Sequence, residues 1–295
     1  MKNKHIKYEA WLKRNTASLK GKTVAVTGST GGLGKALCHY LSYLGADLVL
    51  VDRNRERAEI LRRELTDTYK VSITLLTADM ADMTSVKAVT DQLKSLAPDV
   101  LICNAGAYSI PRRICDTGYD NVFQINFVSP YYMIRALEPV LSVKQGRVVV
   151  VGSIAHNYSK TDPESIDFAD RPQASKVYGN AKRYLMYALC ERSREVTSVS
   201  YSITHPGISF TGITNHYPKV IFALIKHPMK VIFMKPEKAC LSTLKGVFEA
   251  CRECEWIGPR LFDVWGMPRK KRLRTATAQE IGRIVETAEN IIGKL

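Results

Sequence analysis

Short, nearly continuous apolar runs recur along the chain, and they restrict its fold more than any other feature. They are rich in Val, Ile and Leu, and they occupy residues 23–28, 47–52, 71–79, 99–106, 146–153 and 198–207. A strand with one face in water alternates apolar and polar residues, whereas a strand covered on both faces is apolar throughout. The runs therefore predict the strands of a parallel sheet buried between two layers.

The segments between these runs have the periodicity of helices. Apolar residues return every three or four positions in residues 32–45, 54–70 and 84–97, which is the spacing of one helix face. Alternating strands and helices predict an α/β fold with a doubly wound, mostly parallel sheet and helices on both faces. Because ligands of such sheets bind outside the carboxyl ends of the strands, we expect functional residues there.

The first run ends in a glycine-rich turn, TGSTGGLG at residues 27–34, which leads into a predicted helix. Glycine permits tight turns and lets backbone N–H groups approach a pyrophosphate at a helix N-terminus. The turn therefore predicts a dinucleotide site with cofactor contacts from Gly28, Ser29, Thr30, Gly32, Leu33 and Gly34.

The second run ends at Asp52 and Arg53, which point to different cofactors. A carboxylate at this place accepts hydrogen bonds from the adenosine ribose of NAD, whereas a guanidinium holds the 2′-phosphate of NADP. The prediction is NAD(P), with a slight preference for NAD. Residues after the third and fourth runs are also expected to border the cofactor, namely Asp79, Met80, Asn104, Ala105 and Gly106.

A tyrosine and a lysine four residues apart, Tyr178 and Lys182, lie in a predicted helix and share one of its faces. Together with the preceding features, the pair resembles the short-chain dehydrogenase/reductase family. The motifs of the family occur in order as Thr27-Gly28…Gly32-Leu33-Gly34, Asp79, Asn104-Ala105-Gly106, Asn126, Ser153, Tyr178…Lys182 and Pro206-Gly207. Many members have serine directly before the lysine, where this chain has Ala181.

The resemblance implies a Rossmann-like fold and four catalytic residues. Tyr178 would exchange a proton with the substrate oxygen, which Ser153 would also hold. A free phenol has a pKa of about 10, and the charge of Lys182 would favour the phenolate while its ammonium holds the nicotinamide ribose. Asn126, expected within a long helix, would bind a water that links Lys182 to solvent.

The resemblance also implies cofactor contacts from Pro206, Gly207 and Thr211, followed by a substrate lid at residues 208–235. The lid segment is rich in Ile, Phe, Val and Met, with lysines spaced among them. That composition suits a mobile cover over an apolar substrate. It also suits a helix lying on a membrane surface or a contact within a homo-oligomer.

Ser153 and Tyr178 are 25 positions apart, and this long step resembles the retinol-dehydrogenase-like branch of the family. So do His156, the IDFAD stretch at residues 166–170 and the segment 256–272. The branch acts on apolar alcohols and carbonyls such as retinoids and other lipids. Ser153, Tyr178 and His156 are the expected substrate contacts, although a hydrogen-bonded loop histidine is the alternative for His156.

Three regions are expected along the chain: an exposed, basic helical arm at 1–20, the Rossmann-like catalytic domain at 21–265, and a basic, partly helical extension at 266–295. The net charge is +15, with its densest run at residues 269–274. Without interleaved aromatic residues or a nucleic-acid-binding fold, this run indicates a solvated basic face and no nucleic-acid partner. Contact with an acidic membrane surface is an alternative that the sequence does not favour.

No apolar run reaches the roughly 18 residues of a membrane span, and the N-terminus lacks an apolar signal core, so a cytoplasmic location is expected. No metal is expected either, because the Cys251–Cys254 CxxC pair has no second pair or nearby histidine. Six of the seven cysteines are expected to be buried free thiols: Cys38, Cys103, Cys115, Cys190, Cys240 and Cys251.

The sequence thus predicts an NAD(P)-dependent oxidoreductase of an apolar small molecule. The alternative is a cofactor-binding protein that senses redox state or scaffolds a partner without turnover. Retention of Asn126, Ser153, Tyr178 and Lys182 argues against that alternative.

Overall fold

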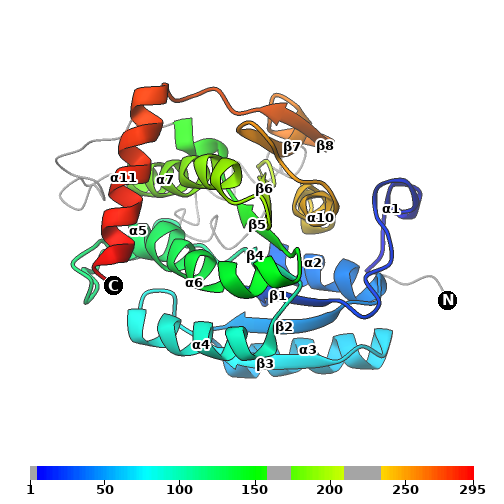
Figure 1. Ribbon diagram of the computed structural model, residues 1–295. Coiled ribbons are helices and arrows are strands. Elements are labelled where there is room, and N and C mark those ends of the chain that lie inside the picture. The colour runs from blue at the N-terminus through cyan, green and yellow to red at the C-terminus, as the bar shows by residue number, and fades with distance from the viewer. Residues whose placement is uncertain (1–4, 158–173, 209–233) are drawn as a thin grey trace, which may run out of the picture.

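The computed structural model describes residues 5–157, 174–208 and 234–295, and its centre is one eight-stranded sheet (Figure 1). The strands are β1 (Thr23–Thr27), β2 (Asp47–Asp52), β3 (Ile73–Thr77), β4 (Val100–Cys103), β5 (Arg147–Val151), β6 (Ser200–Thr204), β7 (Glu255–Leu261) and β8 (Trp265–Arg272). Their spatial order is β3-β2-β1-β4-β5-β6-β7-β8. Strands β1 to β7 pair in parallel, and β8 pairs antiparallel with β7.

Helices cover both faces of this sheet, as the sequence predicts. They are α1 (Glu9–Asn15), α2 (Gly32–Tyr43), α3 (Arg55–Tyr69), α4 (Met83–Leu96), α5 (Asn121–Phe123), the π-helix η1 (Gln124–Val128), α6 (Ser129–Val143), the 3₁₀-helix η2 (Ile154–Asn157), α7 (Ala174–Glu195), α9 (Pro236–Ala239), α10 (Leu241–Phe248) and α11 (Ala278–Gly293). One core packs α2, α3, α9 and α10 against the sheet, and the other packs α4, α5, α6, α7 and α11.

The six predicted strands are confirmed, and their burial explains why they were recognisable. In β1, β4 and β5 nearly every side chain is buried, since helices lie above and below them. The helices begin where polar caps allow. For example, the Asp82 carboxylate accepts the backbone N–H groups of Thr84 (2.9 Å) and Ser85 (3.3 Å) at the start of α4.

The order of strands reverses beside β1, which lies between β2 and β4 although β3 precedes β4 in the chain. Connections leave β1 toward one side of the sheet and β4 toward the other, so the loops after these strands separate. This switch point is where doubly wound sheets bind their ligands. The glycine turn after β1 and the Asn104 loop after β4 both lie there.

Strands β7 and β8 were not among the predicted strands. Proline interrupts both, and β8 is a charged edge strand, features that weaken a strand pattern while protecting a sheet edge. Residues 265–272 therefore belong to the central sheet, and α11 packs against α7 in its core. The basic, partly helical extension expected from residue 266 thus contributes a strand to the sheet and a helix to the core.

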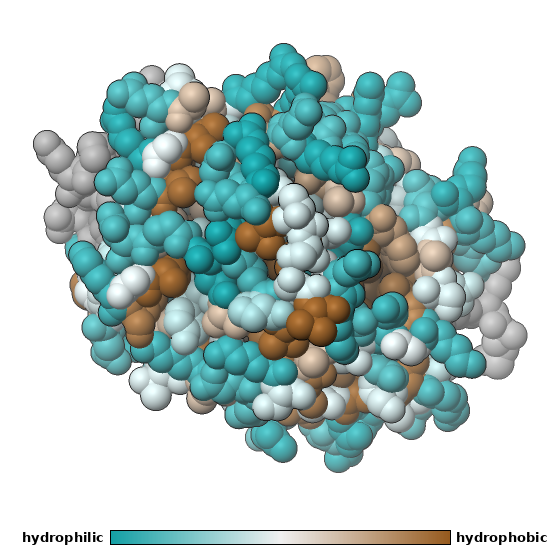
Figure 2. Space-filling model, in the orientation of Figure 1, coloured by the Kyte–Doolittle hydropathy of each residue, from teal (hydrophilic) through white to brown (hydrophobic). Residues whose placement is uncertain are grey.

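The basic run on β8 is largely paired with acidic side chains. Lys270 lies 2.9 Å from Glu249, and Lys271 lies 2.8 Å from Asp263. Arg272 has a longer contact of 3.3 Å to an exposed glutamate. On the face shown in Figure 2, hydrophilic residues predominate and hydrophobic residues form scattered patches. Within the described ranges, no helix has both the length and the apolar character to cross a membrane.

The N-terminal arm packs onto the domain, which corrects the expectation of an exposed arm. Ile6, Leu12 and Leu19 are buried in the core beneath α2 and α10. Lys7 forms an ion pair of 2.6 Å with Glu237 at α9. The arm therefore adds apolar contacts to the domain, although its composition is basic and polar.

Two of the cysteines form a disulfide, which the sequence did not predict. Cys190 on α7 is bonded to Cys254 just before β7, so the expectation of a free thiol at Cys190 is wrong. The other five cysteines are free and buried. Spacing along the chain gave no signal of this pair, because the two residues are 64 positions apart and meet only in the folded core.

Candidate active site

The glycine turn after β1 forms a tight cradle at the start of α2. Gly28 has a φ of 67°, and a Cβ on it would lie 2.8 Å from the Cα of Ala105. Glycine is therefore required both by the backbone angle and by the close approach of the β4 loop. No side chain caps the N-terminus of α2, so its first N–H groups are available to an anion.

Asn104 braces this cradle from the neighbouring strand. Its side-chain amide donates to the carbonyl oxygens of Thr27 (3.0 Å) and Gly28 (2.9 Å). In return, the Thr27 hydroxyl accepts the backbone N–H groups of Asn104 (3.1 Å) and Ala105 (3.0 Å). Asn104 thus holds the shape of the glycine turn, a more specific role than the general proximity predicted from sequence.

Asp52 is engaged by the glycine turn. Its carboxylate accepts the backbone N–H (3.1 Å) and the hydroxyl (2.9 Å) of Thr30, and it also accepts the hydroxyl of Ser29. Burial raises the pKa of Asp52, and these hydrogen bonds oppose the increase. Arg53, by contrast, has a side chain that is 77% exposed, and its guanidinium lies 3.8 Å from Asp79.

The remaining predicted cofactor residues lie at the same edge of the sheet. The Asp79 carboxylate accepts the backbone N–H of Ala81 at 2.9 Å, and buried Met80 accepts the hydroxyl of Ser129 through its carbonyl at 2.7 Å. Pro206 and Gly207 follow β6. Thr211 and nearly all of the expected lid lie outside the described residues.

Lys182 is buried in the centre of the site, with a side chain that is only 3% exposed. Its ammonium donates to the carbonyl oxygen of Val151 at 2.8 Å, at the end of β5. Burial lowers the pKa of Lys182 to about 8, because an ammonium is poorly solvated there. A lysine in this state can hold or release a proton near neutral pH.

Tyr178 lies one helical turn before Lys182, and its side chain is hydrogen-bonded to that of Ser153. Burial raises the pKa of Tyr178 to about 12, and the bond to Ser153 opposes this increase. The Lys182 nitrogen lies 5.7 Å from the centre of the tyrosine ring. Burial therefore outweighs the lowering of the tyrosine pKa that was expected from the lysine.

Asn126 lies in a π-helical turn between α5 and α6, where the sequence predicted one regular helix. Its amide donates to the carbonyl oxygens of Ala107 (2.7 Å) and Val122 (2.8 Å), while its buried Oδ1 has no protein partner. A Cβ on Gly106 would lie 2.9 Å from this oxygen and 3.6 Å from the Lys182 nitrogen. The wide turn thus directs an available acceptor toward the lysine.

His156 is fully buried and both ring nitrogens lie at polar atoms of the protein, which favours the hydrogen-bonded loop histidine over the substrate contact. Its Nδ1 lies 2.6 Å from the carbonyl oxygen of Ser153, and its Nε2 lies 2.9 Å from the hydroxyl of Thr275. Burial lowers its pKa to about 4, so the ring is neutral at physiological pH. Its hydrogen bonds fix the backbone that carries Ser153.

Arg183, which the sequence analysis did not single out, joins this support. Its guanidinium donates to the Glu280 carboxylate and to the carbonyl oxygens of His156 (3.2 Å) and Thr275. The available signal was a second cation directly after Lys182, in a stretch of α7 from 177 to 190 that has no other charged side chain. The C-terminal segment is thus bonded to α7, which carries Tyr178 and Lys182, and to η2, which directly follows Ser153.

Comparisons with known proteins agree with this geometry. A short chain dehydrogenase family model matches residues 22–162. The chain is 29% identical to retinol dehydrogenase 14 of Mus musculus over 275 residues, which covers 83% of this chain and 82% of that protein.

Solved structures share the fold. An uncharacterized protein from Mycobacterium paratuberculosis superimposes with a TM-score of 0.72 at 21% identity, covering 94% of this chain and 95% of that one. A short-chain dehydrogenase from Sphingobium yanoikuyae in complex with NADPH gives a TM-score of 0.59 at 23% identity, covering 76% and 83%.

The fold and the arrangement at its switch point are those of a nicotinamide-dependent oxidoreductase. The chain belongs to the short-chain dehydrogenase/reductase family, and among its relatives are retinol dehydrogenases.

Proposed function

We propose that this enzyme transfers hydride between NAD(P) and an apolar alcohol or carbonyl compound, with Tyr178 as the general acid and base. One observation carries the proposal. Ser153 is hydrogen-bonded to Tyr178, and buried Lys182 lies one turn further along the same helix face. A hydroxyl, a phenol and an ammonium in this order suit proton exchange at a substrate oxygen.

The residues present fit a dinucleotide. The uncapped start of α2 and the Gly28 turn offer N–H groups to a pyrophosphate. Lys182 and Tyr178 would hold the nicotinamide ribose at the other end. The acceptor at Asn126 Oδ1, near Lys182, suits a bridging water. When bound, the nicotinamide ring supplies or accepts the hydride.

Tyr178, Ser153 and Lys182 would then transfer and replace the proton of the substrate oxygen. During reduction, Tyr178 gives its hydroxyl proton to the carbonyl oxygen, and the Ser153 hydroxyl donates a hydrogen bond to the same oxygen. The resulting phenolate is stabilised by the Lys182 cation and regains a proton by way of Lys182 and a water at Asn126. During oxidation the same proton travels in the opposite direction.

The surroundings of Tyr178 favour an apolar substrate. The ring of Tyr108 packs edge-on against that of Tyr178 at 5.2 Å, and partly buried Ile110 and Ile154 border the same core. The relative named retinol dehydrogenase 14 supports this class of substrate. Retinoids, steroids and fatty aldehydes are therefore the first compounds to test.

The contacts of Asp52 and Arg53 favour NADP as the cofactor, whereas the sequence alone slightly favours NAD. The Asp52 carboxylate already binds Thr30 and Ser29, so its approach to the ribose requires it to exchange those bonds. The guanidinium of Arg53 is largely exposed and has a long ion pair of 3.8 Å with Asp79, so it can bind a 2′-phosphate with a smaller rearrangement.

The test is an absorbance screen that follows NADPH and NADH with retinoids, steroids, fatty aldehydes and small ketones. We expect turnover of at least one apolar compound. Tyr178→Phe should lose about 10²–10⁴-fold in kcat while still binding cofactor, and Tyr184→Phe, one and a half turns along the same helix, should remain active. Cofactor binding without turnover of any compound would instead favour a sensor or scaffold, and full activity of Tyr178→Phe would exclude the proposed acid.

A further inference from the structure

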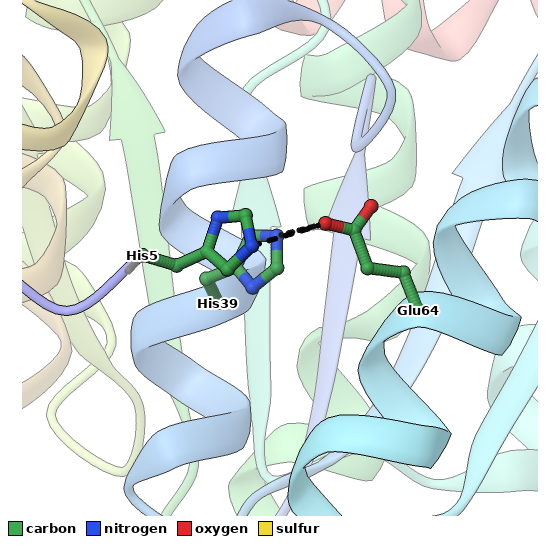
Figure 3. Close-up of side chains that lie close together, drawn as sticks. All are labelled: His5, His39 and Glu64. Carbon is green, nitrogen blue, oxygen red and sulfur yellow. Dashed lines mark ion pairs between the residues drawn. The ribbon is translucent and has the colours of Figure 1, made fainter. Parts of the chain in front are cut away.

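Three side chains from distant parts of the chain meet on the α2–α3 side of the domain (Figure 3). His5 precedes α1, His39 lies on α2, and Glu64 lies on α3. One ligand atom from each falls within 4.8 Å of the other two. Among the described residues, this is the one group of three His, Cys, Asp or Glu side chains with such spacing.

We propose that His5, His39 and Glu64 bind a zinc ion that fastens the N-terminal segment to α2 and α3. Two imidazoles and one carboxylate form a donor set that zinc takes in proteins. The site is separate from the residues around Tyr178, so the proposal does not depend on the enzymatic function. It departs from the sequence expectation of no metal, which considered only the CxxC pair.

The distances between donor atoms favour a shared ion over a simple ion pair. The Nε2 atoms of His5 and His39 lie 3.3 Å and 3.4 Å from the same oxygen, Oε1 of Glu64. Charge-assisted N–H···O contacts are usually shorter, at about 2.7–2.9 Å. Ligands bound at about 2.0–2.1 Å to a tetrahedral zinc lie about 3.3–3.4 Å apart, so His39 and Glu64 already have the separation of two ligands, and His5 starts near it.

The contacts around the three donors resemble the outer shell of a metal site. The other ring nitrogen of His39, Nδ1, lies 3.2 Å from the hydroxyl of Tyr69, which orients the ring. The other carboxylate oxygen of Glu64 accepts the ammonium of Lys35 at 2.6 Å. These two contacts leave Nε2 of His39 and Oε1 of Glu64 directed toward each other.

The two imidazole rings show what must move when the ion binds. They are stacked, with centres 3.9 Å apart and planes inclined by 5°, so their lone pairs run parallel rather than converge. His39 is buried and fixed within α2, whereas His5 lies in a non-helical stretch with a partly exposed side chain. Rotation of the His5 ring would direct its Nε2 to the ion, which can enter from solvent past His5 and Glu64.

The N-terminal segment explains what the ion would do. Its side chains Ile6 and Leu12 are buried against the α2–α10 core. An ion bound by His5, next to Ile6, would join this end of the segment to both α2 and α3. Three protein donors leave the fourth tetrahedral position to solvent, and Lys35 reduces the affinity through its positive charge.

The test measures zinc alone, with no substrate or cofactor. Purified full-length chain is stripped with a chelator, equilibrated with zinc and freed of excess metal, and the bound zinc is counted. We expect one ion per chain, with at least a ~100-fold loss of affinity in Glu64→Gln and in His5→Ala. The matched control is Glu59→Gln, a partly exposed glutamate on the same helix that pairs with Arg62 and Arg63, which should bind as the wild type does. Lys35→Met should bind more tightly.

Cobalt in place of zinc distinguishes this site from the cysteines, since a His–Glu site gives no thiolate charge-transfer band. His5 lies outside the helices and strands, so His5→Ala should fold normally. It therefore replaces a variant of buried His39, which could fail to fold. Less than one ion per chain in the wild type, equal losses in Glu59→Gln and Glu64→Gln, or a thiolate band would each overturn the proposal.

Discussion

Arg183, which directly follows Lys182 on α7, donates two hydrogen bonds of 2.7 and 2.8 Å to Glu280 on α11. Figure 1 shows α11 lying across α7. The guanidinium is almost fully buried and also donates to the carbonyl oxygen of His156, three residues after Ser153. The last helix of the chain therefore supports α7, which carries Tyr178, and the segment that follows Ser153.

Glu280→Ala should destabilise the protein by about 3 kcal/mol, because it leaves a buried guanidinium without its carboxylate. This is the lower end for such a loss, since two carbonyl oxygens still accept from Arg183. As a comparison, Glu191→Ala on α7 removes the ion-pair partner of exposed Arg194 on the same helix. This loss should lower stability by no more than about 1 kcal/mol. Denaturant unfolding compares the two variants, and similar costs would show that Glu280 is not a structural support.

Arg53→Ala should weaken the use of NADPH while leaving NADH nearly unchanged. A hydrogen bond to a charged group contributes about 1.5–3 kcal/mol, so kcat/KM for NADPH should fall by about tenfold to a hundredfold. Arg57→Ala, an exposed arginine in the first turn of α3, serves as the control for lost surface charge. If Asp52→Ala rather than Arg53→Ala changes the ratio of the two cofactors, Asp52 reads the ribose and NAD is the preferred cofactor.

Without cofactor, Lys182 should add stability between pH 8 and pH 10, seen as the difference between the wild type and a variant that lacks the amine. The comparison is needed because burial raises the pKa of the five free thiols, which therefore act in the opposite direction over the same interval. The pKa of Lys182 is about 8 in the folded chain and 10.5 in its ordinary state, so the unfolded chain holds the extra proton across this interval. The gain should be about 2 kcal/mol. Tyr178 acts in the opposite direction only above about pH 10, where the phenol of the unfolded chain ionises first.

Lys182→Met should be more stable than the wild type at pH 7 because a buried charge is removed, and this advantage should shrink by about 2 kcal/mol between pH 8 and pH 10. Lys176→Met, on the same helix, should differ from the wild type by the same amount at every pH. Free energies of unfolding measured at several pH values test both statements. A difference between the wild type and Lys182→Met that does not change with pH would assign the titration to another group.

Burial on both faces is what made the fold predictable from sequence. Strands β1, β2, β4, β5 and β6 are buried between two helical layers, so each one is a visible apolar run. Edge strand β3 is only partly buried but keeps an apolar run. Strands β7 and β8 end the sheet, where prolines and paired lysines replace that pattern. The proposed catalytic residues were recognisable because they match motifs of the family, whose spacing is local or lies at strand ends.

The remaining features of the site depend on tertiary contacts. The π-turn at Asn126 widens a helix without any change in local composition. His156 follows Ser153 by three residues, yet its direction is set by Thr275 near the C-terminus. The charge of Lys182 suggested a lowered pKa for Tyr178, but burial, which short spacing does not reveal, has the larger effect.

The Cys190–Cys254 disulfide should contribute about 4 kcal/mol to stability, the value expected from loop closure over 64 residues. Reduction should therefore lower the stability of the wild type to that of Cys190→Ala and leave that variant unchanged. Cys251→Ala, a buried free thiol beside the bridge, is the control that should still respond to reductant. Alkylation of the unfolded, unreduced chain should modify five thiols, and all seven after reduction. Seven modified thiols without reductant would remove the bridge and favour the reducing cytoplasm, where structural disulfides are rare.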